Sequence, residues 1–544
     1  MAKKFKLIFH TVRYLKFRQI FNRIKRRYFK RAINISPAPD VTLISKKPQS
    51  FVINQIKMIA ENRFKFLNVT ADINTAEDWN QSKQDKLWLY NLHYFDDLNA
   101  FKASQRSTWH SNLIERWVNE NPLGYGNGWE AYPSSLRIIN WIKWSLRGNI
   151  LEQQWLESMA IQVRNLSNNL ETHLLGNHLF ANAKALVFAG LFFKGKEADN
   201  WYQTGLTIIE KELFEQVLDD GGNFELSPMY HSIFLEDLLD LVNIHHTYDK
   251  EVLREIEEKI PLMISWLKAM CHPDGGVSFF NDTAFDVAPS LNELLEYSNR
   301  LNLKKISKQS KQFIHLKDSG YIRVERKNLV AIIDVAHIGP DYIPGHGHAD
   351  VLSFELSIFG KRAIVNSGTS LYGISDERHK QRSTLSHSTV VIDEQNSSEV
   401  WSGFRVGRRA NLLNIQTKNN KNNTKVLASH DGYKRLQGSP IHKREWSFFD
   451  NQIIIKDSIT GKKSHRVSSM LPLHPEVLIT DIKKNYVQLE VNGKSVKIVF
   501  DGIGKLKISP SKYHPKFGLS LDNKKLIYSY KGPLPLIGII KISW

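Results

Sequence analysis

Two patterns of hydrophobic positions divide the chain. Between about residues 50 and 310, apolar residues recur at helical spacing in long, aromatic-rich segments, with short turns containing Gly, Asn or Pro between them. The predicted helices cover 136–146, 155–175, 178–193, 233–246 and 260–270. Successive helical hairpins of this kind predict an (α/α) toroid or solenoid, although the sequence has no clean fixed-period repeat.

The pattern changes to short alternating runs near residue 317. Runs typical of β-strands cover 321–324, 329–334, 389–392, 445–448, 452–455, 487–491 and 496–500. Asn492-Gly493 lies between the last two and predicts a hairpin turn. We therefore expect a helical domain over 49–315, an antiparallel β-sandwich over 316–544, and a site in the cleft between them.

Residues 1–48 form a third part, a basic amphipathic segment followed by a Pro-containing linker. Its first 32 residues contain twelve Lys or Arg and no acidic residue. Apolar residues recur among them at helical spacing: Phe5, Ile8, Phe9, Val12, Phe17, Ile20, Phe21, Ile24 and Tyr28. Such a helix either lies on an anionic membrane surface or docks on the body of the protein, and the sequence leaves both open.

No signal peptide is recognisable at the N-terminus, and no run of about 18 apolar residues predicts a membrane span. We therefore expect the protein in the cytoplasm or peripheral to the inner membrane. The single cysteine, Cys271, excludes an internal disulfide framework.

The formal net charge is +19, and residues 1–32 account for twelve of these charges, which leaves +7 for the remainder. A moderately basic body suits an anionic substrate. The sequence contains no Walker loop, zinc-finger spacing or RNP-like aromatic motif, so no nucleic-acid partner is predicted.

The strongest candidate for chemistry is the stretch Gly345-His346-Gly347-His348-Ala349-Asp350. On an extended strand, histidines two residues apart point to the same face. The alternation in 351–358 predicts a half-buried strand directly after them. The stretch suits proton transfer or metal binding, and the alternative is a loop with two solvated histidines.

Three further stretches carry polar residues at element boundaries: Gly176-Asn177-His178-Leu179-Phe180, the run 224–231 and the run 366–389. Each also has a structural explanation. Asn177 can cap a helix, Tyr230 can be a packed aromatic residue, and His387 can cap the entry to a strand.

Together with the run 88–95, these stretches resemble the heparinase II/III-like family of polysaccharide lyases, in a region from about residue 85 to the end. The resemblance implies an incomplete (α/α) toroid joined to an antiparallel β-sandwich. It also implies cleavage of a uronate-containing acidic polysaccharide by β-elimination.

By this resemblance, Asn177 binds the uronate carboxylate, with His178 the neighbouring candidate. Tyr230 and His346 share removal of the C5 proton and protonation of the departing O4, in an order that depends on the uronate epimer. His231 and Arg382 are further candidates for substrate binding.

The resemblance also implies a structural divalent, zinc-like metal ion held by two histidines and an aspartate. His348 and His387 match the histidines, whereas Asn366 occupies the third position. A neutral amide is a poorer zinc ligand than a carboxylate, so metal binding is left open.

Two other functions stay open at this point. A uronate C5-epimerase removes the same proton and returns one to the opposite face. A non-catalytic glycan-binding assembly protein would not require Asn177, Tyr230 and His346 together. Because no signal peptide is recognisable, the sequence favours a role in exopolysaccharide metabolism near the membrane over that of an exported lyase that degrades external polysaccharide. The sequence does not give the sugar or the oligomeric state.

Overall fold

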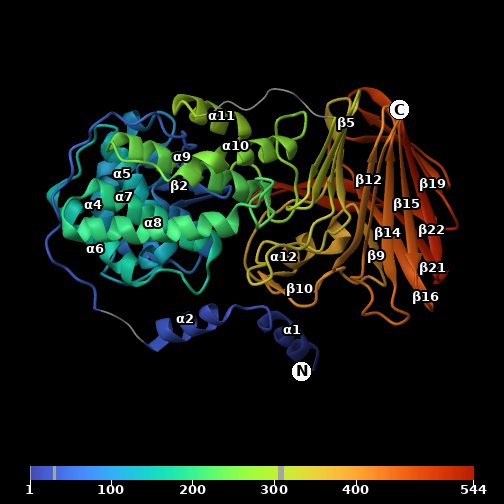
Figure 1. Cartoon of the computed structure of the whole chain (residues 1–544), viewed down its shortest axis with the longest axis horizontal. Helices are drawn as coiled ribbons and strands as arrows, with labels where there is room; N and C mark the ends of the chain where they lie inside the picture. Colours follow the sequence, from blue (N-terminus) through green and yellow to red (C-terminus); the bar gives the residue numbers. More distant parts are fainter. Residues whose placement is uncertain (1, 29–31, 304–311) are drawn as a thin grey trace.

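The computed structural model describes residues 2–28, 32–303 and 312–544 of the 544-residue chain. A helical region comes first and antiparallel sheets follow (Figure 1). The helices are α3 (Lys86–Tyr94), α4 (Ser107–Glu120), α5 (Ala131–Leu146), α6 (Gln153–Asn168), α7 (Gly176–Phe192), α8 (Lys196–Gln216), α9 (Pro228–Thr247), α10 (Arg254–Ala269) and α11 (Leu291–Arg300). A small sheet of β1 (Met58–Ala60), β2 (Arg63–Phe66) and β3 (Val69–Asp72) precedes them.

Helix α7 lies at the centre of the helical region. It is apolar on nearly all sides, as a buried helix must be, and it packs against α5, α8 and α9. The five predicted helices are confirmed, but the one expected to run to residue 175 ends at Asn168 as α6. The backbone turns at Leu175 and Gly176, both at positive φ, and starts α7 in a new direction.

Strands β4–β8 form an antiparallel five-stranded sheet in chain order: β4 (Phe313–Leu316), β5 (Tyr321–Arg326), β6 (Leu329–Asp334), β7 (Phe354–Ile358) and β8 (Lys361–Ile364). An eight-stranded sheet follows in the order β12 (Leu412–Asn419), β13 (Thr424–His430), β14 (Ile441–Phe448), β15 (Gln452–Thr460), β22 (Leu536–Ser543), β19 (Lys494–Asp501), β18 (Tyr486–Val491) and β17 (Leu478–Ile482). A four-stranded sheet has the order β20 (Lys505–Lys516), β21 (Leu519–Pro533), β16 (Ser464–Pro472) and β9 (Val390–Ile392). The predicted antiparallel C-terminal region is confirmed.

The sequence prediction for 351–358 is wrong in extent and in burial. The strand is β7, which begins at Phe354, and all five of its residues are buried. One face joins the apolar core of the sheets, and the other meets the helical region. There His272 bonds Glu355 (Nε2 to Oε2, 3.0 Å) and Ser357 (Nδ1 to Oγ, 2.8 Å). Polar residues alternate along β7 because they face a buried polar interface between the two regions.

The predicted hairpin between β18 and β19 is confirmed. Asn492 and Gly493 both have positive φ, at 51° and 70°, as a two-residue type I′ turn requires.

The N-terminal segment forms two helices, α1 (Ala2–Val12) and α2 (Phe17–Tyr28), which lie along one edge of the molecule (Figure 1). Helix α1 contacts the hairpin of β10 (Val400–Trp401) and β11 (Arg405–Val406). Among the described residues, no helix combines the length and the apolar character needed to cross a bilayer.

Candidate active site

The candidate site is built around the buried carboxylate of Asp282, in the loop between α10 and α11. Oδ2 lies 2.9 Å from His346 Nδ1, and Oδ1 lies 2.9 Å from His348 Nε2. Arg378, from the short helix α12 (Asp376–Gln381), contacts both oxygens, with Nη2 at 2.6 Å from Oδ2. One residue of the helical region thereby binds three side chains of the sheet region.

Asp282 is ionised in this environment. Burial alone would raise its pKa, but the Arg378 guanidinium and the hydrogen bonds from the two histidines outweigh burial and hold the pKa well below its usual value. An ionised carboxylate only accepts hydrogen bonds, so His346 carries its proton on Nδ1 and His348 carries its proton on Nε2. In the neutral form of each ring, the second nitrogen, Nε2 of His346 or Nδ1 of His348, therefore carries the lone pair.

The Tyr230 ring packs against the His346 ring, with centroids 3.9 Å apart. Pro228 begins α9, five residues before the predicted helix over 233–246, and the Ser227 side chain caps the helix by accepting the Tyr230 backbone N–H at 3.3 Å. The two hydroxyls of Tyr230 and Tyr372 are 2.9 Å apart. Burial, and then the neighbouring Tyr372, raise the pKa of Tyr230 well above its ordinary value, so its phenol is protonated near neutral pH.

Asn177 lies in the first turn of α7, and its side-chain amide has no hydrogen-bond partner among the described residues. Its backbone N–H lies 3.4 Å from Glu225 Oε1, while Glu225 Oε2 is 3.5 Å from His346 Nε2. Glu225 thus joins Asn177 to His346. A side chain at Gly176 would bring its Cβ within 2.9 Å of Glu225 Oε1, so glycine is required for this close approach.

His178 lies beside Asn177 and faces Glu171, with Nδ1 at 3.2 Å from Oε1. Its ring also packs against Tyr132, with centroids 4.5 Å apart. Burial disfavours the charged imidazole, but Glu171, helped by Glu225 and Glu130, outweighs burial and raises the pKa of His178. The start of α7 therefore offers an amide and an imidazolium to an anionic group.

Two predicted substrate contacts are contradicted by the structure. Nε2 of His231 is 2.9 Å from the Met263 carbonyl, and Nδ1 accepts the Asn223 N–H at 3.2 Å. Burial lowers the pKa of His231 to about 3, and the neutral ring stacks on Trp266. Because both nitrogens serve the backbone, His231 is part of the core.

Arg382 is also fully buried. Its guanidinium donates to the carbonyls of Gly347 (Nε, 3.1 Å) and Gly403 (Nη1, 3.1 Å), so it is not presented to a substrate. It supports the loop that carries His346. A Cβ at Gly347 would meet the Ile338 carbonyl at 2.4 Å, which shows how tightly this loop is held.

Three residues of the site were not selected from the sequence. Glu225 and Tyr372 lie inside stretches that drew attention for other residues. Asp282 had no signal, because a single aspartate in a turn between helices has neither periodicity nor motif spacing.

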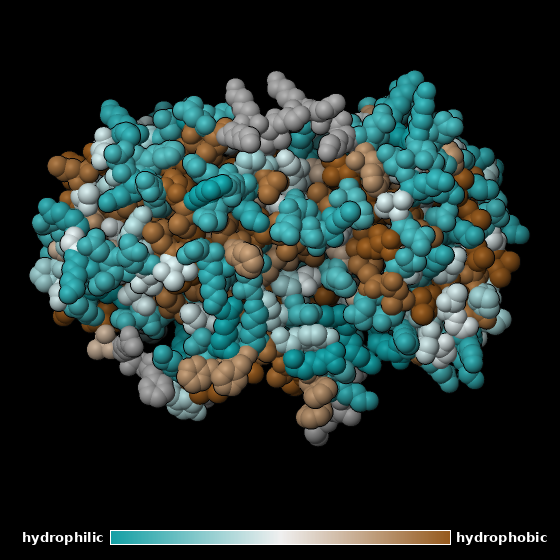
Figure 2. Space-filling view, in the orientation of Figure 1, coloured by the Kyte–Doolittle hydropathy of each residue, from teal (hydrophilic) through white to brown (hydrophobic). Residues whose placement is uncertain are grey.

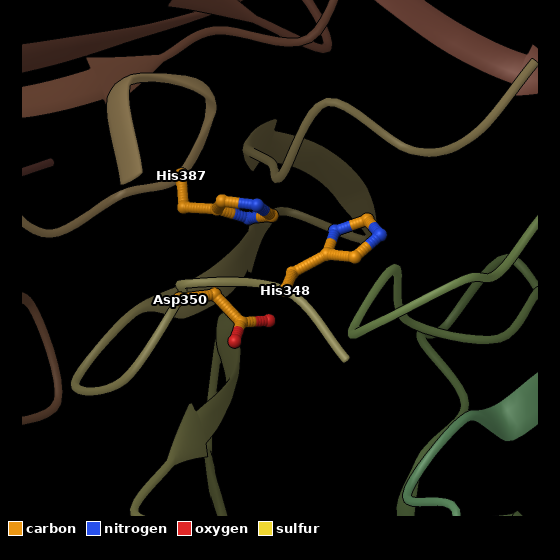
Figure 3. Close-up of side chains that lie close together, drawn as sticks. All are labelled: His348, Asp350 and His387. Carbon is orange, nitrogen blue, oxygen red and sulfur yellow. The ribbon is translucent and has the colours of Figure 1, made fainter. Parts of the chain in front are cut away.

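A second cluster adjoins the first and joins His348, Asp350 and His387, with ligand atoms all within 4.8 Å of one another. Figure 3 shows the two imidazole rings next to one another and the Asp350 carboxyl beside them. His348 Nδ1, Asp350 Oδ2 and both ring nitrogens of His387 are buried, and within the described chain no hydrogen bond satisfies them. This donor set fits a divalent metal such as zinc.

The cluster differs from the sequence prediction in its third residue. The predicted residue, Asn366, is turned to other partners: Oδ1 accepts the Ser388 N–H at 3.3 Å, and Nδ2 lies 3.5 Å from Ser353 Oγ. The carboxylate with the two histidines belongs to Asp350, and burial raises its pKa to about 6. Asp350 lies in the stretch that the sequence indicated for proton transfer or metal binding, but the family resemblance gave the third ligand position to Asn366.

Comparison with protein families gives two matches that together cover almost the whole chain. Residues 8–303 match the model described as heparinase II/III N-terminus, and residues 308–544 match the one described as heparinase II/III-like, C-terminal.

Individual relatives agree with these matches. The chain is 26% identical to a heparin-sulfate lyase of Bacteroides stercoris over 54% of this chain and 45% of the relative. It is 30% identical to one of Pedobacter heparinus over 56% of this chain and 50% of the relative. The chain thus matches about half the length of these relatives.

Solved structures show the same fold. A crystal structure of heparinase III superposes with a TM-score of 0.67 at 17% identity, covering 88% of this chain and 78% of that one. A heparan sulfate lyase mutant from Pedobacter heparinus gives 0.60 at 18% identity, covering 96% of this chain and 87% of that one.

Proposed function

We propose that this chain, which belongs to the heparinase II/III-like family, is a polysaccharide lyase. It cleaves a uronate-containing, glycosaminoglycan-like polysaccharide by β-elimination. The observation that carries the proposal is the Tyr230 phenol packed on the His346 imidazole. Asn177, whose side-chain amide is unpaired among the described residues, contacts Glu225 through its backbone N–H, and Glu225 in turn lies beside His346. The relatives named heparin-sulfate lyases support the substrate class.

The first requirement of the reaction is a more acidic C5 proton. The uronate carboxylate withdraws electrons poorly while it is charged, so a hydrogen-bond donor must bind it and stabilise the enolate-like intermediate. The free amide of Asn177 supplies one donor. The His178 imidazolium, held charged by Glu171, supplies a second.

Proton transfer is divided between His346 and Tyr230. His346 has its proton on Nδ1, bound to Asp282, so Nε2 takes the proton from C5. The electron pair forms the C4–C5 double bond, and the C4–O4 bond breaks. The departing O4 takes a proton from Tyr230, whose raised pKa keeps the phenol protonated until then. Exchange with solvent restores both groups.

The direct test is a panel of acidic polysaccharides, followed by ultraviolet absorbance of the unsaturated uronate product. A rise in absorbance with one or more substrates is expected. The same samples in deuterated water distinguish the C5-epimerase, which would incorporate deuterium at C5 without cleavage. A panel that includes heparan sulfate and gives neither cleavage nor exchange would contradict the proposal and favour a glycan-binding protein.

The proposal includes the finer fold, an incomplete (α/α) toroid formed by the helices of 49–315 and an antiparallel sandwich of 316–544. The order of paired helices from α3 to α11 supports the toroid. The eight-stranded and four-stranded antiparallel sheets support the sandwich.

The role of His178 predicts a pH dependence of substrate binding. Its pKa is raised, so the imidazolium that binds the uronate carboxylate is present at low pH and is lost as pH rises through that pKa. We expect KM to increase across this range. Glu171→Gln removes the main group that raises the pKa, so the increase moves to lower pH. Measurements of KM against pH test this, and His178→Gln should remove the inflection. An unchanged inflection in Glu171→Gln would exclude His178 as its source.

We also propose that His348, Asp350 and His387 hold one divalent, zinc-like ion with a structural role. Bound there, the ion would tie the loop that carries His346 to the segment before β9. A metal present at 1,000 times its Kd stabilises the folded state by about 4 kcal/mol. We therefore expect chelation to lower the melting temperature.

Metal analysis after zinc loading gives the second measurement. Asp350→Asn is expected to lose most of the bound metal, whereas Asn366→Ser, at the position that the sequence favoured, should retain it. The reverse pattern would assign the third ligand to Asn366.

A further inference from the structure

Helices α1 and α2 contact the protein through their polar residues. Trp401 Nε1 donates to Thr11 Oγ1 at 3.1 Å, and Thr11 donates to the Val406 carbonyl at 3.0 Å. On α2, Gln19 Nε2 donates to the Tyr342 carbonyl at 3.3 Å. Lys16 and Arg18, at the start of α2, both bind the Glu215 carboxylate. The surface that faces the body is therefore mainly polar, and Leu7 also packs beside Gly407 there.

The opposite surface of both helices is apolar and faces solvent. Each of nine large apolar side chains is 38% to 80% exposed: Phe5, Ile8, Phe9, Val12, Phe17, Ile20, Phe21, Ile24 and Tyr28. Figure 2 shows brown and tan residues along the lower edge, where these helices lie in Figure 1. A surface helix normally buries its apolar stripe against the core. Here the orientation is reversed, which marks an interaction surface.

Positive charge surrounds this apolar surface. Residues 1–32 contain twelve Lys or Arg and no acid, and several of them are exposed beside the apolar residues: Lys4, Lys6, Arg23, Lys25 and Arg26. A cavity of about 310 Å³ at the end of α1 is lined by Arg13, Arg408, Arg409, Lys434 and Arg435 together with one acid, Asp431. Arg408 and Arg409 in this lining are paired with Glu399 and Asp341. A binding partner that matches both the apolar surface and the basic residues around it has an apolar interior and a negatively charged surface.

We propose that α1 and α2 dock this protein on an anionic lipid bilayer, with both helices lying in the plane of the surface. The apolar side chains enter the boundary between headgroups and acyl chains, and the basic residues bind lipid phosphates. A second copy of the chain fits less well, because it would bring the same exposed basic residues, such as Lys4, Lys6 and Arg23, against this surface. An acidic glycan would pair with the charges and leave the phenylalanines exposed.

Docking through this surface would also place the candidate active site near the lipid. Tyr342, which α2 contacts, lies four residues before His346. Asn22 of α2 lies 3.5 Å from the Thr172 carbonyl, and Arg26 contacts His173, in the loop that leads to Asn177. Polysaccharide at a membrane surface would therefore be within reach of the site.

The test uses the full chain and flotation with vesicles of phosphatidylcholine alone or mixed with phosphatidylglycerol. We expect binding to the anionic vesicles that weakens as salt is raised. Phe17→Ser with Phe21→Ser should reduce this binding about tenfold or more, since two aromatic anchors are lost. Phe101→Ser, at a side chain that is 54% exposed like Phe21 but has no contact with α1 or α2 among the described residues, is the matched control and should bind as the wild type does.

Three results would overturn the proposal. The first is no binding of the wild type to anionic vesicles, and the second is equal binding by the double variant. The third is a wild-type dimer that the double variant converts to a monomer without any vesicle binding, which would assign the surface to self-association. Because Phe17 and Phe21 are both exposed, we expect the double variant to have the same melting temperature as the wild type.

Discussion

Tyr230→Phe is expected to lower kcat by about 10²- to 10⁴-fold, the range that general acid–base groups contribute, while KM changes little. The substitution removes one oxygen and keeps the ring that packs on His346. The departing O4 then has no positioned proton donor. Steady-state kinetics of product absorbance measures the effect.

Tyr372→Phe is the matched control. It removes the hydroxyl that lies 2.9 Å from the Tyr230 hydroxyl but keeps the proton donor itself. Loss of one neutral hydrogen bond corresponds to a decrease of about tenfold or less. If Tyr230→Phe retains more than about a tenth of wild-type kcat, the phenol is not the acid.

Asp282→Asn is expected to affect activity and stability together. An amide has no charge to balance Arg378, and removing one partner of a buried ion pair costs about 3–5 kcal/mol of the free energy of unfolding. The amide also no longer compels His346 to carry its proton on Nδ1. We expect kcat to decrease by about 10²-fold or more, since the ring then samples the wrong tautomer. Denaturant unfolding and kinetics measure the two effects.

The control for Asp282 is another aspartate–arginine pair, away from the site. Asp274 binds Arg362, with Oδ2 at 2.7 Å from Nε, and its side chain is 39% exposed. Asp274→Asn should cost less stability and leave the dependence of kcat on pH unchanged. If Asp282 is only structural, Asp282→Asn also leaves the dependence of kcat on pH unchanged. If Asp282 positions the two histidines, the substitution shifts the pH profile of kcat and, through His348, lowers the metal content.

Local signals were enough to predict much of the fold. The Asn492-Gly493 turn sets a hairpin, and hydrophobic periodicity locates the central helix α7. The helix predicted over 233–246 is α9, which begins five residues earlier at Pro228 because Ser227 caps it there. Helix α8 was missed although it has 21 residues. The reversed orientation of α1 and α2 was also beyond prediction, because amphipathic spacing defines two faces and does not say which one contacts the body.

The candidate site was predicted in part for a similar reason. Asn177, Tyr230 and His346 came from short motifs in a fixed order, and the structure brings them together. His231 follows Tyr230 on one helix, but successive helical residues point about 100° apart, so the second side chain enters the core. Asp282 acquires its role only from partners more than 60 residues away along the chain.

The position of Asp282 also has a consequence for biosynthesis. Ribosomes make the helical region first, so this aspartate leaves the exit tunnel before its partners His346, His348 and Arg378 have been translated. The candidate site is completed only when the second half of the polypeptide folds against the first. A chain that ends before His346 therefore lacks side chains on which the proposed lyase activity depends.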